Sequence, residues 1–249
     1  MTINLERRAF VQSGALLATG VALANAVAPR SAAAQVPPPA PSGANPMTYA
    51  IKPMSFDPKK IKGLSEKILI SHYENNYSGA VKRLNAISEQ LAGLDFAKAP
   101  GFLINGLKRE ELIAANSMIL HELYFAGLGE ESRPVAALAE AIARDFGSMD
   151  RWRAEFVAMG KAEGGGSGWV LLTWSSHDRR LVNAWAADHT TTLAGGQPIL
   201  VLDMYEHAYH MDYGAKAGDY VDAFMQAIRW SNADSLYERL SRGRAVWPL

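Results

Sequence analysis

The chain has 249 residues, about half of them apolar, and its 25 acidic side chains balance its 25 basic ones. This length suits one large domain or two small ones. The balanced charge gives no electrostatic reason to expect binding to nucleic acid or to an anionic membrane. The sequence contains no cysteine, which excludes disulfides, thiolate metal ligands and a cysteine nucleophile. Any bound metal must therefore be held by His, Asp, Glu or Tyr.

Residues 1–34 have the layout of an export signal, with basic residues before an apolar run and small residues before Gln35. Arg7-Arg8, followed by Ala9-Phe10, indicates the bacterial twin-arginine type, which exports proteins that are already folded. A general secretory signal that carries two arginines is the alternative. The apolar run is too short and too rich in alanine for a membrane span. We therefore expect a periplasmic protein whose mature form has no membrane anchor.

Residues 35–53 are rich in proline and lack apolar periodicity, which predicts an extended linker. The folded part of the chain is expected to start near Met54. We predict an N-terminal helical domain over residues 54–130 and a C-terminal α+β domain over residues 131–249.

Apolar residues recur at helical spacing in several parts of the chain. The predicted helices cover residues 64–91, 109–125, 135–145, 148–159 and 219–231. Gly93 and Gly127 follow the first two helices and are suited to end them, and Ser148 is a good N-cap for the fourth. The first two helices are long enough to pair as an antiparallel hairpin.

A glycine-rich segment at residues 164–168 breaks the helical pattern and is followed by apolar runs typical of strands. The predicted strands cover residues 169–174, 180–185 and 198–202. The sequence therefore predicts an α+β protein. An N-terminal antiparallel helical hairpin would be followed by an α/β domain with a small, about three-stranded, antiparallel sheet and flanking helices.

Four residues have side chains that suit a metal site. Asp203 follows the third predicted strand and His207 comes four positions later, a spacing that brings two side chains to one face of a helix or tight turn. His72 and His121 each lie among apolar residues in one of the two long helices. Either histidine alone is more often a hydrogen-bonded core residue, but both together with the Asp203/His207 pair favour a ligand set. Three imidazoles and one carboxylate suit Mn, Fe or Zn.

The motifs around these residues resemble those of the iron/manganese superoxide dismutases, and the resemblance covers about residues 54 to 240. The Asp-x-x-Glu-His-Ala-Tyr element at residues 203–209 is its most specific part. The other matching motifs, in chain order, are His72-Tyr73 with Leu84-Asn85, His121 with Leu123-Tyr124-Phe125, Asp145-Phe146-Gly147-Ser148, and Gly166-Ser167-Gly168-Trp169.

The resemblance implies one iron or manganese ion per subunit, bound by His72, His121, Asp203 and His207. In this family the ion cycles between its divalent and trivalent states, oxidising one superoxide to dioxygen and reducing the next to peroxide. Trp169 is implied to form a wall of the metal pocket, and Glu206 to reach the ligand histidine of the other subunit, the equivalent of His207. We therefore expect a homodimer with superoxide as its substrate and no nucleic-acid partner.

Several positions around the site differ from the family pattern. The family has a tyrosine and a histidine along the substrate channel, where this chain has Ala80 and Asn76. A glutamine normally hydrogen-bonds the solvent at the metal, and the two positions that can supply it are Ser117 and Gly165. Tyr205 stands where the family usually has a tryptophan.

Asn76 and His210 are a candidate replacement for a hydrogen-bonded His–Tyr pair that the family places across its dimer interface. The alternative, held equal, is that both are tolerated polar replacements. Other polar residues near the motifs are expected at the solvated surface: His177, His189, Glu122 and Glu163. The alternative for the two glutamates is that one of them replaces a missing acid beside the metal ligands.

Three functions stay open. The first is a superoxide dismutase of low activity, because the missing glutamine and tyrosine support proton delivery and tune the redox potential. The second is a Mn- or Fe-binding protein of the same family without significant dismutase activity. The third is a peroxidase or oxidase at the same site, since Ala80 leaves space at the channel mouth.

Overall fold

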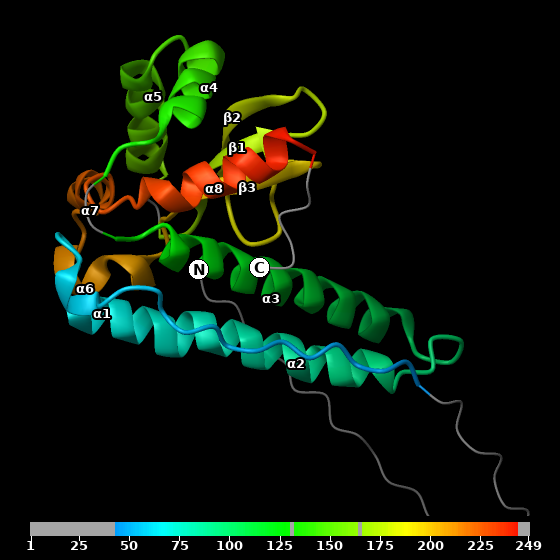
Figure 1. The fold of residues 1–249 in the computed structure, drawn as a ribbon. Helices are drawn as coiled ribbons and strands as arrows, with labels where there is room; N and C mark the ends of the chain where they lie inside the picture. The colour runs from blue at the N-terminus through cyan, green and yellow to red at the C-terminus, as the bar shows by residue number, and fades with distance from the viewer. Residues whose placement is uncertain (1–42, 130–131, 164–165, 244–249) are drawn as a thin grey trace, which may run out of the picture. The chain divides into compact units, whose positions relative to one another are not determined.

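A computed structural model describes residues 43–129, 132–163 and 166–243 of the chain (Figure 1). The expected export signal, the first part of the linker and Gly165 lie outside the described residues. The described residues form one compact unit, and the division near residue 130 stays a prediction.

The first long helix is built from three consecutive segments: α1 (Glu66–Ser71), a π-helical turn η2 (His72–Tyr77) and α2 (Ser78–Ala92). Ser65 caps its start, because the side-chain oxygen accepts a 3.1 Å hydrogen bond from the backbone N–H of Ile68. The predicted helix over residues 64–91 is therefore confirmed, apart from the π-helical turn. That turn begins at His72, and such turns often occur at functional sites.

The second long helix, α3 (Gly101–Ala126), packs beside α2 and runs in the opposite direction (Figure 1). It begins eight residues before the predicted start at residue 109. Its first turns are mostly solvent-exposed and contain Gly101 and Gly106, so they carry no apolar stripe that periodicity could detect. Pro100 supplies the N-cap and fixes where the helix starts.

The described part of the linker is extended and docks on the helical hairpin. The backbone of Tyr49 exchanges two hydrogen bonds with the Asn85 side chain of α2, at 2.8 and 2.9 Å. The N–H of Lys52 donates to the Tyr77 hydroxyl at 2.8 Å. Ordered packing therefore starts before the expected position at Met54. A short 3-10 turn, η1 (Pro58–Lys60), leads into the first long helix.

Two shorter helices precede the sheet, α4 (Ala136–Phe146) and α5 (Met149–Ala162). Gly147 between them has a positive φ of 92°, a backbone conformation that glycine adopts readily. The Ser148 hydroxyl accepts a 3.0 Å hydrogen bond from the N–H of Arg151 and caps α5 as predicted.

The sheet has three antiparallel strands in the order β2-β1-β3. Their bounds are β1 (Trp169–Ser175), β2 (Arg180–Ala186) and β3 (Gly196–Asp203). Every residue of the central strand β1 is buried, because α3 and α8 pack on β3 and α4 and α5 pack on β1 and β2. The predicted α+β fold class, with a helical N-terminal part and a three-stranded antiparallel sheet, is confirmed.

The prediction of one continuous helix over residues 219–231 is wrong. The chain forms η3 (Glu206–Ala208), α6 (His210–Tyr213), α7 (Ala217–Phe224) and α8 (Trp230–Ser241). The break after α7 arises because the backbone there pairs with the residues that follow α3: Ile228 forms a β-bridge with Leu128, and the N–H of Arg229 donates to the Gly127 carbonyl at 2.7 Å.

Among the described residues, no helix is long and apolar enough to cross a bilayer.

Candidate metal centre

The four predicted ligand residues converge in the structure although they come from separate segments. His72 lies in η2, His121 in α3, Asp203 at the end of β3 and His207 in η3. One ligand atom from each residue lies within 4.8 Å of all the others. The register of the sheet contributes to this arrangement, because Asp203 leaves β3 directly opposite Trp169, the first residue of β1.

The distances between the ligand atoms fit a metal ion. The Oδ2 atom of Asp203 lies 3.2 Å from Nε2 of His72, 3.6 Å from Nε2 of His121 and 3.2 Å from Nε2 of His207. The Nε2 atoms of His121 and His207 are 3.4 Å apart. Ligand atoms bonded at about 2.1 Å to one ion in tetrahedral geometry would lie about 3.4 Å from each other.

Neighbouring groups orient two of the ligands toward the centre. Nδ1 of His121 lies 2.6 Å from the backbone carbonyl of Ser117, so the ring donates its proton there and leaves the lone pair of Nε2 for a metal. Oδ1 of Asp203 accepts a 2.8 Å hydrogen bond from the N–H of Tyr205, which leaves Oδ2 to face the imidazoles. Nε2 of His72 is buried without a hydrogen-bond partner, which a cation would explain.

Burial and charge keep the ligands in the protonation states that a metal requires. Burial lowers the pKa of His72, and it lowers the pKa of His121 to about 3, so both rings are neutral at pH 7. Burial alone would raise the pKa of Asp203, but attraction to His207 and His72 and a hydrogen bond from His207 hold that pKa well below its usual range. The side chains of His72, His121 and Asp203 are at most 1% exposed, whereas that of His207 is 24% exposed.

Aromatic side chains surround this group. Trp169 meets the His121 ring edge-on with centroids 5.2 Å apart, and Tyr205 stacks on His207 at 5.3 Å. Tyr124 and Phe125 of α3 each lie 5.0 Å from the His72 ring. Such a shell excludes water and lowers the local dielectric constant around a bound ion.

A cavity of about 260 Å³ lies beside the centre, between the π-helical turn and α3. Polar or small side chains dominate its lining: Asn75, Asn76, Gly79, Ala80, Arg83, Ile113, Ala114, Ser117 and His189. The cavity thus brings together two of the positions that depart from the family pattern in the substrate channel, Asn76 and Ala80. His210 lies elsewhere on the surface, at the start of α6.

The expectation that His189 is a solvated surface residue is wrong. Its ring is partly buried, accepts a 3.1 Å hydrogen bond from Nε1 of Trp169 and stacks on Tyr205 with centroids 4.8 Å apart. The ring centroid also lies 6.2 Å from that of His121. No sequence signal marked this residue, because it lies in an irregular loop between two strands. His177, in contrast, is at the surface as expected, with a side chain that is 90% exposed.

Glu163 is also not the solvated residue that the sequence suggested. Its Oε1 accepts a 3.1 Å hydrogen bond from the backbone N–H of Trp169, and its Oε2 is buried without a partner. Burial raises the pKa of this carboxyl to about 8. Gly168 makes room for it: a Cβ atom there would lie 1.8 Å from Oε1 of Glu163.

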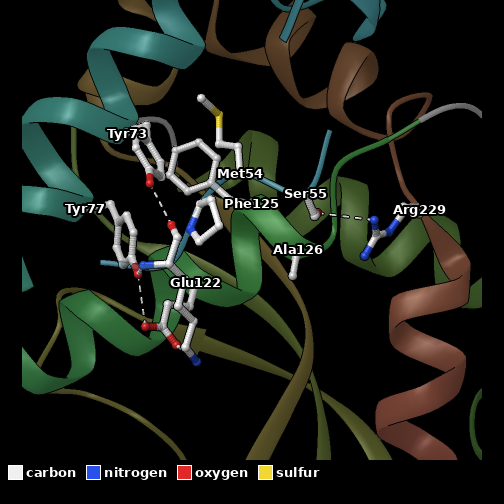
Figure 2. Close-up of a pocket in the computed structure, with 10 residues that line it drawn as sticks. Met54, Ser55, Tyr73, Tyr77, Glu122, Phe125, Ala126 and Arg229 are labelled. Carbon is white, nitrogen blue, oxygen red and sulfur yellow. Dashed lines mark hydrogen bonds and ion pairs between the residues drawn. The ribbon is translucent and has the colours of Figure 1, made fainter. Parts of the chain in front are cut away.

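Glu122 of α3 is likewise not the solvated residue expected from the sequence, and Figure 2 shows its hydrogen bond with Tyr77. Its side chain is only 8% exposed, forms a 2.8 Å ion pair with Lys52 and accepts a 3.1 Å hydrogen bond from the Tyr77 hydroxyl. Burial raises the pKa of Tyr77 to about 12. The cavity of about 200 Å³ that these residues line holds none of the four ligand side chains. Phe125 also lines it, so this cavity borders the aromatic shell around His72.

Comparison with known proteins agrees with this geometry. The family described as iron/manganese superoxide dismutases, C-terminal domain, matches residues 134–236. The chain is 68% identical to an iron superoxide dismutase of Cupriavidus metallidurans over 75% of this chain and 95% of that protein. It is 34% identical to a manganese superoxide dismutase of Haloferax volcanii over 78% and 97% of the two chains. It is 35% identical to an iron superoxide dismutase of Aquifex pyrophilus over 73% and 88%. With such relatives matched over most of their length, the chain belongs to the iron/manganese superoxide dismutase family.

Proposed function

We propose that this protein is a superoxide dismutase that uses one iron or manganese ion per subunit. The observation that carries the proposal is the convergence of His72, His121, Asp203 and His207, with ligand atoms within 4.8 Å of one another, in a chain of this family. Imidazole and carboxylate ligands suit both metals. When bound, the ion would supply one-electron redox chemistry, oxidising one superoxide and reducing the next.

The protein's own side chains would prepare that chemistry in three ways. The aromatic shell of Trp169, Tyr205, Tyr124 and Phe125 limits the access of water and larger molecules. The Asp203 carboxylate adds one negative charge to a centre whose buried imidazoles are neutral, which favours the higher oxidation state of an ion. Arg83, which is ion-paired with Glu110, brings a guanidinium group to the wall of the neighbouring cavity, where it would interact with an anion such as superoxide.

The proposed function includes a low dismutation rate. Ser117 and Ala80 both face the cavity beside the centre in place of the larger polar residues of the family. A low dismutation rate is the expected consequence, because hydrogen bonds to the groups around a metal tune its potential and proton supply. The enlarged cavity at Ala80 also keeps a peroxidase or oxidase function as the second candidate.

The quaternary structure that we propose is a homodimer. Glu206 is exposed, and His207 is the ligand with the most exposed side chain. Nδ1 of His207 has no hydrogen-bond partner in the part of the chain that the structure describes, although ligand imidazoles almost always have one. Glu206 of the partner subunit would supply it, and Asn76 would face His210 of the partner subunit. Export through the signal containing Arg7-Arg8 places this dimer in the periplasm.

The test is peroxide production that depends on superoxide, measured with purified protein loaded with iron or with manganese. The proposal expects a rate per metal well above that of the same ion free in solution. A protein that binds one ion per chain but is no faster than the free ion would be a metal-binding protein without dismutase function. Faster turnover of peroxide or of an organic electron donor than of superoxide would support the peroxidase or oxidase instead. Sedimentation of the same sample tests the dimer, with Glu206→Gln expected to shift it toward monomer.

A further inference from the structure

The cavity of about 200 Å³ that Glu122 lines is formed by the extended segment before η1 and by the helical hairpin (Figure 2). The segment is held over the hairpin, because the Tyr73 hydroxyl donates a 2.6 Å hydrogen bond to the Lys52 carbonyl. Most of the remaining lining is apolar: Pro53, Met54, Phe125 and Ala126. A concave, largely apolar site with a few polar groups is typical of small-molecule binding.

Three charged side chains line this cavity, and two of them compensate each other. Glu122 forms a 2.8 Å ion pair with Lys52. Arg229 is the third, and no carboxylate lies within ion-pair distance of it among the described residues. The cavity therefore has one positive charge that the described part of the chain leaves uncompensated, which favours an anionic occupant.

The backbone that follows α3 fixes the position of Arg229. The N–H of Arg229 donates to the Gly127 carbonyl at 2.7 Å. A Cβ atom on Gly129 would lie 2.9 to 3.1 Å from three carbon atoms of the Arg229 stem, so the glycine lets this stem lie against the main chain. Figure 2 shows the guanidinium group directed toward Ser55 at the cavity wall. The charge is therefore held at one end of the cavity.

The guanidinium group has more donors than the protein uses. Its Nη1 donates to the Ser55 hydroxyl at 3.2 Å. Its Nε is buried and has no hydrogen-bond partner, and Nη2 has none within the described ranges. The N–H groups of Nε and Nη2 form one edge of the planar group, and this edge matches the two oxygens of a carboxylate. Since a buried donor without a partner is unfavourable, the arrangement suits an acceptor that the described chain does not supply.

The walls define the rest of the ligand. The rings of Tyr73 and Phe125 meet edge-on with centroids 5.6 Å apart, and aromatic rings of this kind pack well against another planar ring. The volume of about 200 Å³ limits the occupant to a small molecule. The other neighbour of Phe125 is the His72 ring, at 5.0 Å. An occupant that touches Phe125 would therefore be separated from a metal ligand by one aromatic ring.

We propose that this cavity binds a small carboxylate with a planar apolar body. Arg229 would pair with the carboxylate, and the rings of Tyr73 and Phe125 would contact the apolar body. The site shares no residue with the four metal ligands. Its occupancy requires neither electron transfer nor dismutation, so the proposal does not rest on the proposed function.

The first test is calorimetric titration of the iron-loaded protein with benzoate at constant ionic strength. We expect one benzoate per chain, with a Kd of about 1 mM or lower. Benzyl alcohol has the ring without the charge, and acetate has the charge without the ring. Both are expected to bind at least about tenfold more weakly than benzoate. Absence of benzoate binding, or equal affinity for either of the other two compounds, would overturn the proposal.

Azide distinguishes this cavity from the metal ion, because it is a small anion that can bind to iron. Benzoate affinity is expected to be the same with and without saturating azide. Benzoate that azide displaces would be bound at the metal centre, and the proposal would be wrong. If benzoate binds as expected but the protein does not dismutate superoxide, only the proposed function fails.

Two variants locate the site. Arg229→Met keeps a stem that can pack on Gly129 but removes the charge, and it should weaken benzoate binding at least about tenfold. Ala126→Leu keeps the charge but adds bulk to the cavity wall, and it should weaken binding of both benzoate and benzyl alcohol. Arg151→Met, at an exposed arginine of α5 outside the cavity, is the matched control and should bind benzoate normally.

Circular dichroism and iron content show whether each variant is folded and loaded. Benzoate affinity that is unchanged in a folded Arg229→Met or Ala126→Leu protein would contradict the proposal. If Arg229→Met does not fold, the comparison of benzoate with benzyl alcohol on the wild-type protein decides the role of the charge, and Ala126→Leu decides the location.

Discussion

Trp169 and Asp203 are directly opposed residues of the antiparallel pair β1·β3. The pairing places the indole that meets His121 and the carboxylate that meets three imidazoles at the same end of the sheet. The ladder continues one step further, since the N–H of Met204 donates to the Gly168 carbonyl at 3.0 Å. The sheet therefore supplies a rigid edge on which the metal centre is built, and the two long helices bring His72 and His121 to it.

Replacing Asp203 by Asn is expected to abolish stoichiometric metal binding. The amide still accepts from the N–H of Tyr205, so the local turn is retained, but the negative charge that faces His72 and His207 is lost. Metal analysis after purification should give far less than one ion per chain. Asp222→Asn, at a carboxylate that is 53% exposed in an ion pair with Lys161, is the matched control and should bind metal normally. A stoichiometric ion in Asp203→Asn would mean that the carboxylate is not a ligand.

The two buried imidazoles are expected to make the metal-free protein less stable as the pH falls from 7 to 5, against the opposite contribution of Glu163. His72 and His121 have lowered pKa values in the folded state, so the unfolded chain takes up their protons below about pH 6.5 while the folded protein does not. For His121 this proton uptake by the unfolded chain would lower the free energy of unfolding by about 2 kcal/mol over this interval, and His72 would act in the same direction. Asp203, whose pKa is also lowered, contributes stability that is lost only below its usual pKa of 3.8, outside the interval.

Urea denaturation at the two pH values measures this change. His121→Gln should remove about 2 kcal/mol of the imidazole contribution. His177→Gln, at an exposed side chain, should leave it unaltered. An unaltered pH dependence in His121→Gln would show that this imidazole is not buried in neutral form.

The ligand set was predictable because each residue carries a local signal. His72 and His121 lie mid-helix among apolar neighbours, and Asp203 and His207 share a short motif. His189 carries no such signal, because a loop residue is positioned by tertiary contacts with Asn116, Trp169 and Tyr205 that no local pattern encodes. The helices were predictable where one face is buried.

Two parts of the fold were not predicted, because hydrophobic periodicity carries no signal for either of them. The first turns of α3 are exposed and therefore lack an apolar stripe. The break between α7 and α8 depends on backbone pairing between Ile228 and Leu128, which are far apart in the chain. The start of α3 follows from continuation of the helix beyond its buried part, and the break between α7 and α8 follows from a long-range contact. Hydrophobic periodicity detects neither of these.

Glu163 is expected to make the protein less stable as the pH rises from about 5 to 8. Burial raises the pKa of this carboxyl to about 8 in the folded state, so the folded protein holds a proton that the unfolded chain has already released. Because the side chain is only partly buried, solvent screening limits the effect to about 1–2 kcal/mol. Glu163→Gln, which retains an acceptor for the N–H of Trp169, should therefore be more stable than wild type at pH 9 and no more stable at pH 5. Glu238→Gln, at an exposed carboxylate, should show no such difference between the two pH values.

Replacing Gly168 by Ala is expected to destabilise the protein by about 3 kcal/mol, from two separable causes. The backbone of Gly168 has a φ of 141°, a conformation that L-residues rarely adopt. The added methyl group would also lie 1.8 Å from Oε1 of Glu163 and force that carboxylate away from Trp169. In a Glu163→Ala background the steric part disappears, so Gly168→Ala should cost less there, while the backbone part remains. Equal costs in the two backgrounds, measured by denaturation as a double-mutant cycle, would show that Glu163 does not occupy the space that Gly168 leaves.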